Sequence, residues 1–324
     1  MPKTVKVPEI NLTLDLDKLQ EINQSGEGTI YKIDDSWVIK IFLDPEGEQR
    51  EKIRIMEKSF SQDNSPWSGL KSIATIPEYL ARNENGKIVG YLMKNLQGWM
   101  EINNLYDEDF CKESNISIKI ILWIFGLLHE ALEKIHKNGY AVGDLNGSNI
   151  LVSPFKTDLN VRIVDTDSWT INRPDLGINF CPLVQDPEVT HPDHLKAQQN
   201  GKPIPPFLPK HDWWTFTYLM AKCLTKRDPF EEGNFWNLES EERRQSGKTT
   251  MHAGIVMNRD AAIRHLQIGI VLKHFMKRWL SCTKEGIFPI NLLKANYAEM
   301  SYCPSCKIEV NKRLTLCPSC AVLL

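Results

Sequence analysis

Residues 140–152 read YAVGDLNGSNILV, in which Asp144 is followed five residues later by Asn149. Asp165, which ends the apolar run VRIV, adds a second carboxylate. Carboxylate and amide oxygens can hold Mg²⁺, and a further carboxylate can orient a hydroxyl group for attack on a phosphoryl group. Because Asp, Asn, Gly and Ser also form ordinary turns ahead of strands, this stretch alone leaves a purely structural role open.

Two segments nearer the N-terminus could complete a nucleotide site. Residues 26–33 read GEGTIYKI, and the glycines would let a backbone approach phosphate oxygens closely, with a plain hairpin as the alternative. Residues 37–42 read WVIKIF and place Lys40 on an apolar strand. Its ammonium group could reach the phosphates, or it could lie on the solvent face of an edge strand.

The helical run KHDWWTFTYLMAKCLTKRDPF, with Asp212 near its start, follows these motifs. In this order and spacing, the chain resembles the protein-kinase superfamily over residues 21–300. The motifs VGDLNGSNILV, DTDSW and HDWWTFTYLMAKCL are similar to a bacterial Ser/Thr-kinase-like branch. Some members of that branch carry zinc-ribbon tails, and some are found with tellurite-resistance and stress proteins. The resemblance implies an α+β, two-lobed fold, with a β-rich N-lobe, a helical C-lobe and a cleft between them.

The resemblance also implies ATP and Mg²⁺ as cofactors and a protein substrate whose Ser/Thr hydroxyls receive the γ-phosphate. Its catalytic residues would be Asp144 as the base, Lys40 on the phosphates, and Asn149 and Asp165 as the Mg²⁺ ligands. The implied cofactor-binding residues are Gly26, Glu27, Gly28, Thr29, Ile33, Lys40, Glu51, Met93 and Leu96.

Among these implied residues, Met93 would be the gatekeeper, and 94–96 the hinge whose backbone holds adenine. Glu51 is the favoured partner of Lys40, and the short spacing leaves Glu48 and Glu57 open. Asp212 is expected to anchor the backbone of the catalytic loop.

Several positions depart from the kinase pattern. They are Val142-Gly143 for His-Arg, Asn146 for a lysine, Thr166-Asp167 for Phe-Gly, Tyr31 for the third loop glycine, and Asp193 in a weak Ala-Pro-Glu match. None removes a metal ligand, the base or Lys40, so we expect an active enzyme without control by loop phosphorylation. A pseudokinase scaffold that binds nucleotide or protein partners without transfer is the alternative, and a small-molecule kinase of the same fold is the third.

The C-terminal segment CPSCKIEVNKRLTLCPSC carries two Cys-x2-Cys knuckles. Cys303, Cys306, Cys317 and Cys320 could present four thiolates to one Zn²⁺, brought together by a hairpin of 307–310 with 313–316. This zinc ribbon is expected to be a docking module or a structural cap. The other cysteines are expected to be buried, inert thiols: Cys111, Cys181, Cys223 and Cys282.

The composition is that of a soluble globular protein, with 42% apolar and 25% charged residues and a net charge of -2. That charge argues against non-specific nucleic-acid binding. We expect no membrane segment, because residues 118–128 are too short an apolar stretch to span a bilayer, and we expect a cytoplasmic location. By resemblance only, the partners would include a cognate phosphatase and a von Willebrand-type domain protein.

The elements that must position these residues follow from periodicity. Short strands are expected within 21–43 and 67–96, a strand pair at 150–152 and 161–164, and helices at 48–60, 115–137, 211–225 and 260–281. Residues 240–258 show no clear pattern. The expected domains are an N-terminal extension (1–20), the N-lobe (21–96), the C-lobe (97–300) and the zinc ribbon (301–324).

Overall fold

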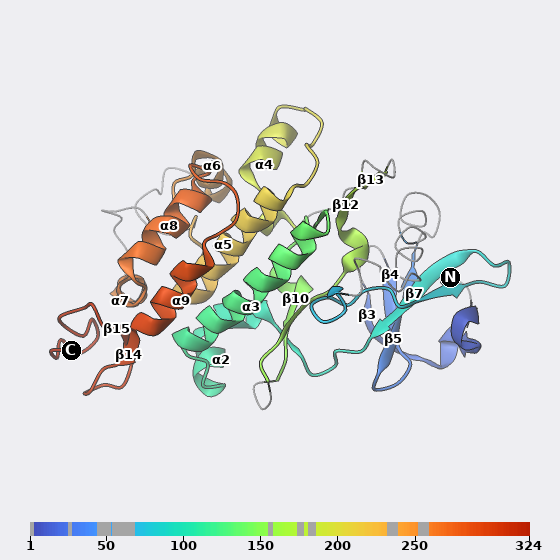
Figure 1. The fold of residues 1–324 in the computed structure, drawn as a ribbon, viewed down its shortest axis with the longest axis horizontal. Helices are drawn as coiled ribbons and strands as arrows, with labels where there is room; N and C mark the ends of the chain where they lie inside the picture. Colours follow the sequence, from blue (N-terminus) through green and yellow to red (C-terminus); the bar gives the residue numbers. More distant parts are fainter. Residues whose placement is uncertain are drawn as a thin grey trace.

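The computed structural model describes residues 3–24, 28–43, 53, 69–154, 158–173, 178–180, 186–231, 239–251 and 259–324. Figure 1 shows a sheet lobe, which holds the N-terminus, beside a body of helices that leads to the C-terminus. The expected two-lobed α+β arrangement is therefore confirmed. Within the described residues, no helix is both long enough and apolar enough to cross a membrane.

An antiparallel sheet forms the N-terminal lobe, with the strand order β2-β1-β6-β7-β5-β4-β3. Its strands are β1 (Thr4–Val7), β2 (Leu12–Asp15), β3 (Gln20–Gln24), β4 (Gly28–Lys32), β5 (Trp37–Phe42), β6 (Tyr79–Arg82) and β7 (Ile88–Lys94). β1 and β2 fall within the segment 1–20 that the sequence set apart as an extension. They lengthen the sheet, because β1 pairs with β2 on one side and with β6 on the other. The helix predicted at 48–60 lies, apart from Ile53, outside the described residues.

β5 is an interior strand of this sheet, between β7 and β4, and its side chains alternate between the two faces. Ile39 and Ile41 pack in a cluster on the outer face, whereas Val38 and Phe42 join the main core that continues into the helical lobe. Lys40 lies between Val38 and Phe42 in this alternation and therefore faces the helical lobe. The alternative of a solvent-facing edge strand is wrong, because Lys40 is only 2% exposed.

The C-terminal lobe is built on helices, with short strands between them. The helices are α2 (Glu108–Glu113), α3 (Ile118–Lys137), α4 (Pro192–Gln199), α5 (Pro209–Thr225), α6 (Ser240–Ser246), α7 (Arg259–Gln267), α8 (Ile270–Leu280) and α9 (Ile290–Glu299). α3 and α5 confirm the predicted helices at 115–137 and 211–225. α5 is buried along most of its length and contacts both α3 and α8, so it forms the centre of the lobe.

Two small sheets lie near the junction of the lobes. β10 (Ile150–Val152) pairs with β11 (Val161–Ile163) and with β8 (Met100–Glu101), which confirms the predicted strand pair. β12 (Thr170–Arg173) pairs with β9 (Tyr140–Ala141) and with β13 (Ile178–Phe180).

One predicted helix is wrong in extent, because the segment 260–281 forms α7 and α8 with a break at Gly269. A Cβ atom at Gly269 would lie 2.4 Å from Nδ2 of Asn296 and 3.0 Å from Nδ2 of Asn311. The break therefore lets α9 and the C-terminal segment approach the backbone. α6 lies in the region 240–258, for which the sequence showed no clear pattern.

The predicted C-terminal hairpin is also wrong. β15 (Glu309–Asn311) pairs with β14 (Met300–Tyr302), which precedes the first cysteine knuckle, and not with residues 313–316. The chain reverses at the knuckle itself, where Lys307 has a φ of 63° and its amide donates to the carbonyl of Cys303 at 3.1 Å. The knuckle is thus the turn of the hairpin.

The Cys module, residues 300–324, is fastened to the start of α3. The Glu309 carboxylate accepts hydrogen bonds from the amides of Ile118 and Lys119, which are otherwise unsatisfied at a helix N-terminus. Gln267, at the end of α7, donates to the Glu309 carbonyl at 2.8 Å. The module is consequently a fixed part of the helical lobe.

The predicted inert cysteines can be located in part. Cys111 and Cys223 are buried as expected, Cys282 is half-buried, and Cys181 lies outside the described residues. Burial raises the pKa of Cys223 and of Cys282 to about 12, which keeps both thiols protonated near neutral pH.

Three buried histidines pack together where α4 and α5 begin. The rings of His191 and His194 lie 4.6 Å and 4.3 Å from the ring of His211. Nδ1 of His191 accepts from the Asp193 amide at 3.1 Å, and Nδ1 of His211 accepts from the Leu208 amide at 3.0 Å. Asp193 and the rings of His191 and His211 are close enough together to share a metal ion. The Nδ1 lone pairs of both rings, however, already accept the hydrogen bonds that cap α4 and α5.

These histidines should make the fold sensitive to acid. Burial lowers the pKa of His191 and of His211 to about 3 and that of His194 to about 4, against 6.5 for a free side chain. The unfolded chain thus binds more protons below pH 6.5, so stability should be complete above that value and fall as the pH drops toward 4. Each histidine can contribute up to ~1.4 kcal/mol per pH unit.

The measurement is urea unfolding at a series of pH values. His194→Phe should make the free energy of unfolding less dependent on pH between 4 and 6.5, because one buried titrating ring is removed. The exposed His274→Gln is the control and should leave the slope unchanged. An equal slope for His194→Phe and the parent would contradict this account.

Candidate active site

The loop that carries Asp144 is held in place by the side chain of Asp212 on α5. The buried Asp212 carboxylate accepts hydrogen bonds from the amides of Val142 at 2.8 Å and Gly143 at 2.9 Å, and it contacts Nε2 of His136 at 2.8 Å. The expected anchoring role of Asp212 is confirmed. Gly143 has a φ of 74°, a left-handed conformation that favours glycine, so this loop has a local reason for glycine at that position.

The Asp144 carboxylate is fixed by three donors. Its Oδ2 accepts from the side-chain amides of Asn146 at 3.0 Å and Asn149 at 3.3 Å, and its Oδ1 accepts from the Asp186 amide at 3.0 Å. Partial burial is the main cause that raises the pKa of Asp144 to about 6, and nearby carboxylates add to it. Asp144 is therefore oriented, and it can accept a proton near neutral pH.

Asn146, which departs from the kinase pattern, shapes this loop. Its side-chain oxygen accepts from the amides of Ser148 at 2.9 Å and Asn149 at 3.0 Å, which caps the 3₁₀ turn Gly147–Asn149. The Asn146 side chain thus links the Asp144 carboxylate to the turn that carries Asn149.

The pairing of β10 with β11 brings the two candidate Mg²⁺ ligands together. Ile150 pairs with Ile163, and the Val164 amide donates to the Asn149 carbonyl at 2.9 Å. Asn149 and Asp165 therefore lie next to each other at the end of this strand pair. Asp165 follows in a left-handed conformation, with a φ of 58°.

Lys40 reaches this point from the sheet lobe. Its ammonium nitrogen lies 2.5 Å from Oδ1 of Asp165 and 2.9 Å from Oδ2 of Asp167. Burial disfavours the charged ammonium, but the charges of Asp167 and Asp165 outweigh this effect and raise the pKa of Lys40. The sequence did not identify Asp167 as a partner of Lys40; its only signal was a second carboxylate two residues after Asp165.

The implied nucleotide contacts are described in part. Gly28 begins β4, where a Cβ atom would lie 2.7 Å from the Ile41 carbonyl oxygen, so the site requires a glycine. Thr29 follows it and is buried, and Met93 is buried on β7 opposite Val38. Gly26, Glu27, Glu48, Glu51 and Glu57 lie outside the described residues.

One of the implied contacts, Ile33, lies away from the candidate site, and Ile30, which the sequence did not suggest, lies beside Lys40. Ile33 packs against the outer-face cluster with Ile39 and Ile41, on the side of the sheet away from Lys40. Ile30 pairs directly with Lys40 and packs against the core between the lobes. The period-two alternation of β4 could have identified Ile30. The Leu96 carbonyl accepts from the Trp99 amide at 3.0 Å.

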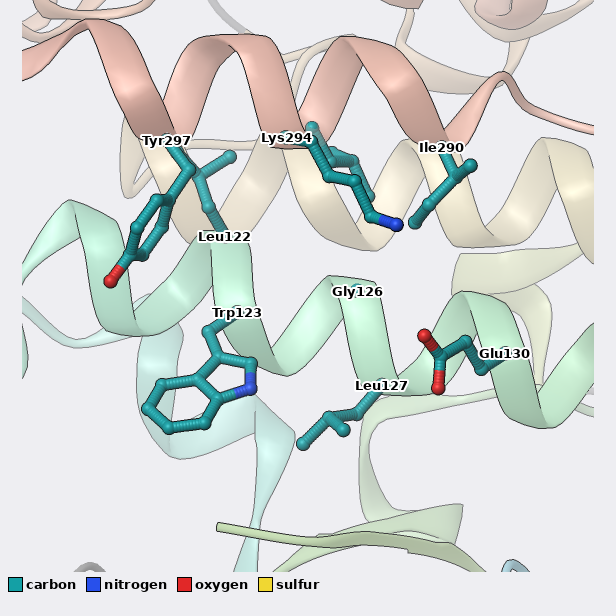
Figure 2. A pocket seen from close by; sticks show the side chains of 9 residues that line it. Leu122, Trp123, Gly126, Leu127, Glu130, Ile290, Lys294 and Tyr297 are labelled. Atoms are coloured by element: carbon teal, nitrogen blue, oxygen red, sulfur yellow. The ribbon is translucent and has the colours of Figure 1, made fainter.

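A separate cavity of about 360 Å³ lies on the helical lobe between α3 and α9 (Figure 2). Trp123 and Leu127 from α3 and Ile290 from α9 are among its lining residues, and Trp123 is half-exposed. None of the candidate catalytic residues lines it, so this cavity is separate from the candidate active site.

The four C-terminal sulfur atoms form a compact group within 4.8 Å of one another. Sγ of Cys303 lies 3.6 Å from Sγ of Cys320, and Sγ of Cys306 lies 3.6 Å from Sγ of Cys317. A tetrahedral Zn²⁺ with bonds of ~2.3 Å requires sulfur separations of ~3.8 Å, whereas a disulfide requires ~2 Å. The geometry therefore fits four ligands of one metal ion.

The two knuckles have the same backbone arrangement. The Cys303 amide donates to the Ile308 carbonyl at 2.9 Å, and the Cys317 amide donates to the Val322 carbonyl at 2.8 Å. Lys307 and Ala321, each directly after a knuckle, both have a positive φ. The duplicated motif therefore folds as two equivalent turns that face each other.

Comparison with known proteins supports the fold. No protein-family model and no curated protein matches the sequence. Among solved structures, the chain is similar to the ROP18 kinase domain in complex with AMP-PNP and sucrose, with a TM-score of 0.55 and 12% identity. The match covers 92% of this chain and 83% of that chain. The chain therefore has a protein-kinase-like fold.

Asp212→Asn should loosen the loop around Asp144. Asparagine has one acceptor oxygen, so the amide of Val142 or of Gly143 loses its partner in a buried site, which costs ~1–3 kcal/mol. Local opening should rise by a factor of ~5–150, measured as faster hydrogen–deuterium exchange in a peptide that covers 140–150.

The matched control for this variant is Asp228→Asn. Asp228 is a buried carboxylate of the same lobe that accepts from the Tyr218 hydroxyl and the Phe230 amide. Its replacement should lower the melting temperature without faster exchange at 140–150. Unchanged exchange there in Asp212→Asn would show that Asp212 does not hold the loop.

Proposed function

We propose that this protein is an ATP-dependent protein kinase that transfers the γ-phosphate to Ser/Thr hydroxyls of a protein substrate. The observation that supports this proposal most is the convergence of Lys40, Asp144, Asn149 and Asp165 at the junction of the two lobes of a kinase-like fold. Phosphoryl transfer requires positioning and electrostatic stabilisation more than covalent chemistry, and these four side chains can supply both.

Each of these residues has a distinct role in the proposal. Asn149 and Asp165 would hold Mg²⁺, which neutralises charge on the phosphates when it is bound. Lys40 places a positive charge near the phosphates. Asp144 orients the acceptor hydroxyl and accepts its proton, and the donors from Asn146 and Asp186 keep its carboxylate pointed at that hydroxyl.

A pseudokinase scaffold is the second candidate, and one observation favours it. Asp165, the proposed Mg²⁺ ligand, lies in an ion pair with Lys40 at 2.5 Å. A site that stays closed in this way would bind nucleotide weakly, and the protein would act through its partners.

The two candidates differ in what Asp144→Asn and Asp165→Asn do. Asp144→Asn removes only the group that accepts the proton, so turnover should fall ~10²-fold or more while Mg²⁺–ATP affinity stays nearly constant. Asp165→Asn should lose turnover and also weaken the Mg²⁺ dependence of nucleotide binding. Phosphate transfer from labelled ATP and calorimetric ATP binding measure these effects. Transfer by Asp144→Asn at the parent rate would favour the scaffold.

We further propose that the four cysteines of the Cys module bind one Zn²⁺, since their sulfur separations fit a tetrahedral site. Replacing Cys303 and Cys317 by Ser should reduce zinc from about one ion per chain to none, measured by mass spectrometry of the metal. Because Glu309 in this module caps α3, the melting temperature should fall as well. ATP affinity should be retained, since the nucleotide residues lie elsewhere.

Cys282→Ser is the matched control for zinc binding. Cys282 lies outside the group of four, so its replacement should leave the zinc content at the parent value. Full zinc content in the Cys303/Cys317 double variant would exclude the four-sulfur site.

A further inference from the structure

Asp167 is the most enclosed carboxylate at the junction of the two lobes. Its side chain is 1% exposed, whereas that of Asp165 is 28% exposed. Oδ1 and Oδ2 of Asp167 accept from the Lys40 ammonium at 3.0 Å and 2.9 Å. A buried carboxylate is tolerated only when it is paired and hydrogen-bonded, so the contact with Lys40 balances the charge of Asp167.

Tyr91, on β7 of the sheet lobe, supplies a further hydrogen-bond donor to Asp167. It is fully buried on β7, pairs with Lys40 of β5 across the two strands, and its hydroxyl donates to Oδ1 of Asp167 at 2.6 Å. The ring also packs against Phe42, with 5.9 Å between the ring centroids. Tyr91 and Lys40 thus hold the Asp167 carboxylate from neighbouring strands.

The turn that carries both carboxylates is fixed by hydrogen bonds from two of its own hydroxyl groups. In the 3₁₀ turn Thr166–Ser168, the Thr166 hydroxyl donates to the Thr75 carbonyl at 3.0 Å, and the Ser168 hydroxyl donates to the Asp165 carbonyl at 2.7 Å. The turn directs Asp167 into the core and leaves Asp165 at its more open side. The two carboxylates are therefore not equivalent.

We propose that Asp167, held by the Tyr91 hydroxyl, is a positioning residue that fixes the Lys40 ammonium and so frees Asp165 to bind Mg²⁺. Lys40 carries one positive charge and, among the described residues, contacts the carboxylates of Asp165 and Asp167. When Asp165 turns toward a metal ion, Lys40 keeps Asp167 as a buried counter-ion and stays in place. The catalytic consequence rests on the proposed function, but the effect on ligand binding does not.

Asp167→Asn tests this division of roles. With that charge removed, Lys40 pairs more strongly with Asp165, which then competes with Mg²⁺. The Mg²⁺ concentration that half-saturates Mg²⁺-dependent ATP binding should rise about tenfold. ATP affinity measured without Mg²⁺ should stay the same or increase, because the site has lost one negative charge. A merely structural defect would weaken both kinds of binding together.

Tyr91→Phe is the second variant, and it removes only a hydroxyl group. It should raise the half-saturating Mg²⁺ concentration in the same direction by about twofold to threefold. The double variant should behave like Asp167→Asn alone, because Tyr91 acts through Asp167. If Asp167→Asn does not fold, Tyr91→Phe still decides the question, since an unchanged Mg²⁺ dependence in it overturns the proposal.

The helical lobe offers a matched control pair. The Tyr218 hydroxyl donates to the buried Asp228 at 2.5 Å, which reproduces the tyrosine–aspartate contact away from Lys40. Tyr218→Phe and Asp228→Asn should lower the melting temperature and leave the Mg²⁺ dependence unchanged.

Calorimetric titration of each variant with ATP, with and without Mg²⁺, gives all of these values without any turnover. A parent protein that transfers no phosphate would therefore refute the proposed function and leave this test intact. Parallel losses of both kinds of ATP binding in Asp167→Asn would overturn the role of Asp167.

Discussion

The buried ammonium of Lys40 is the interaction on which the arrangement of the two lobes depends. It comes from an interior strand of the sheet, and the carboxylates that it contacts among the described residues lie 125 and 127 residues further along the chain. A charge in this position is stable only while those partners stay within hydrogen-bonding distance. The sheet and the turn at Thr166–Ser168 are therefore held in a fixed relative position by these contacts.

The helical lobe applies the same principle to the backbone. Asp212 is a buried carboxylate on the central helix, and it is balanced by two main-chain amides of the loop at Val142 and Gly143. Because α5 is buried along most of its length, the loop takes its position from the centre of the lobe. The core therefore determines the position of Asp144, and the proton transfer proposed for this residue would require such precise placement.

The features of the fold and site that depend on neighbouring residues could be predicted from the sequence. Asp144 and Asn149 belong to one short loop, and α3 shows the helical spacing of its buried face. Contacts between distant segments were not visible in this way. The pairing of β1 with β6 and the contact of Asp167 with Lys40 both join residues that lie far apart in the sequence. The pairing of β14 with β15 is local, but it was missed because the sequence placed the turn at residues 311–312 and the chain turns at the first cysteine knuckle. The break at Gly269 likewise depends on side chains from α9 and β15.

The strands β1 and β2 have a consequence for where this protein can be cut. A boundary at residue 21, where the kinase-like motifs begin, would remove the neighbour of β6 and leave its hydrogen-bonding edge open. It would also uncover the outer-face cluster that Val5, Val7 and Leu14 help to cover. Open edges beside apolar surface promote association between chains. With β1 and β2 present, this edge of the sheet ends instead in short strands flanked by the ion pairs Lys3–Asp17 and Lys18–Asp15, and charged residues of this kind disfavour edge-to-edge pairing.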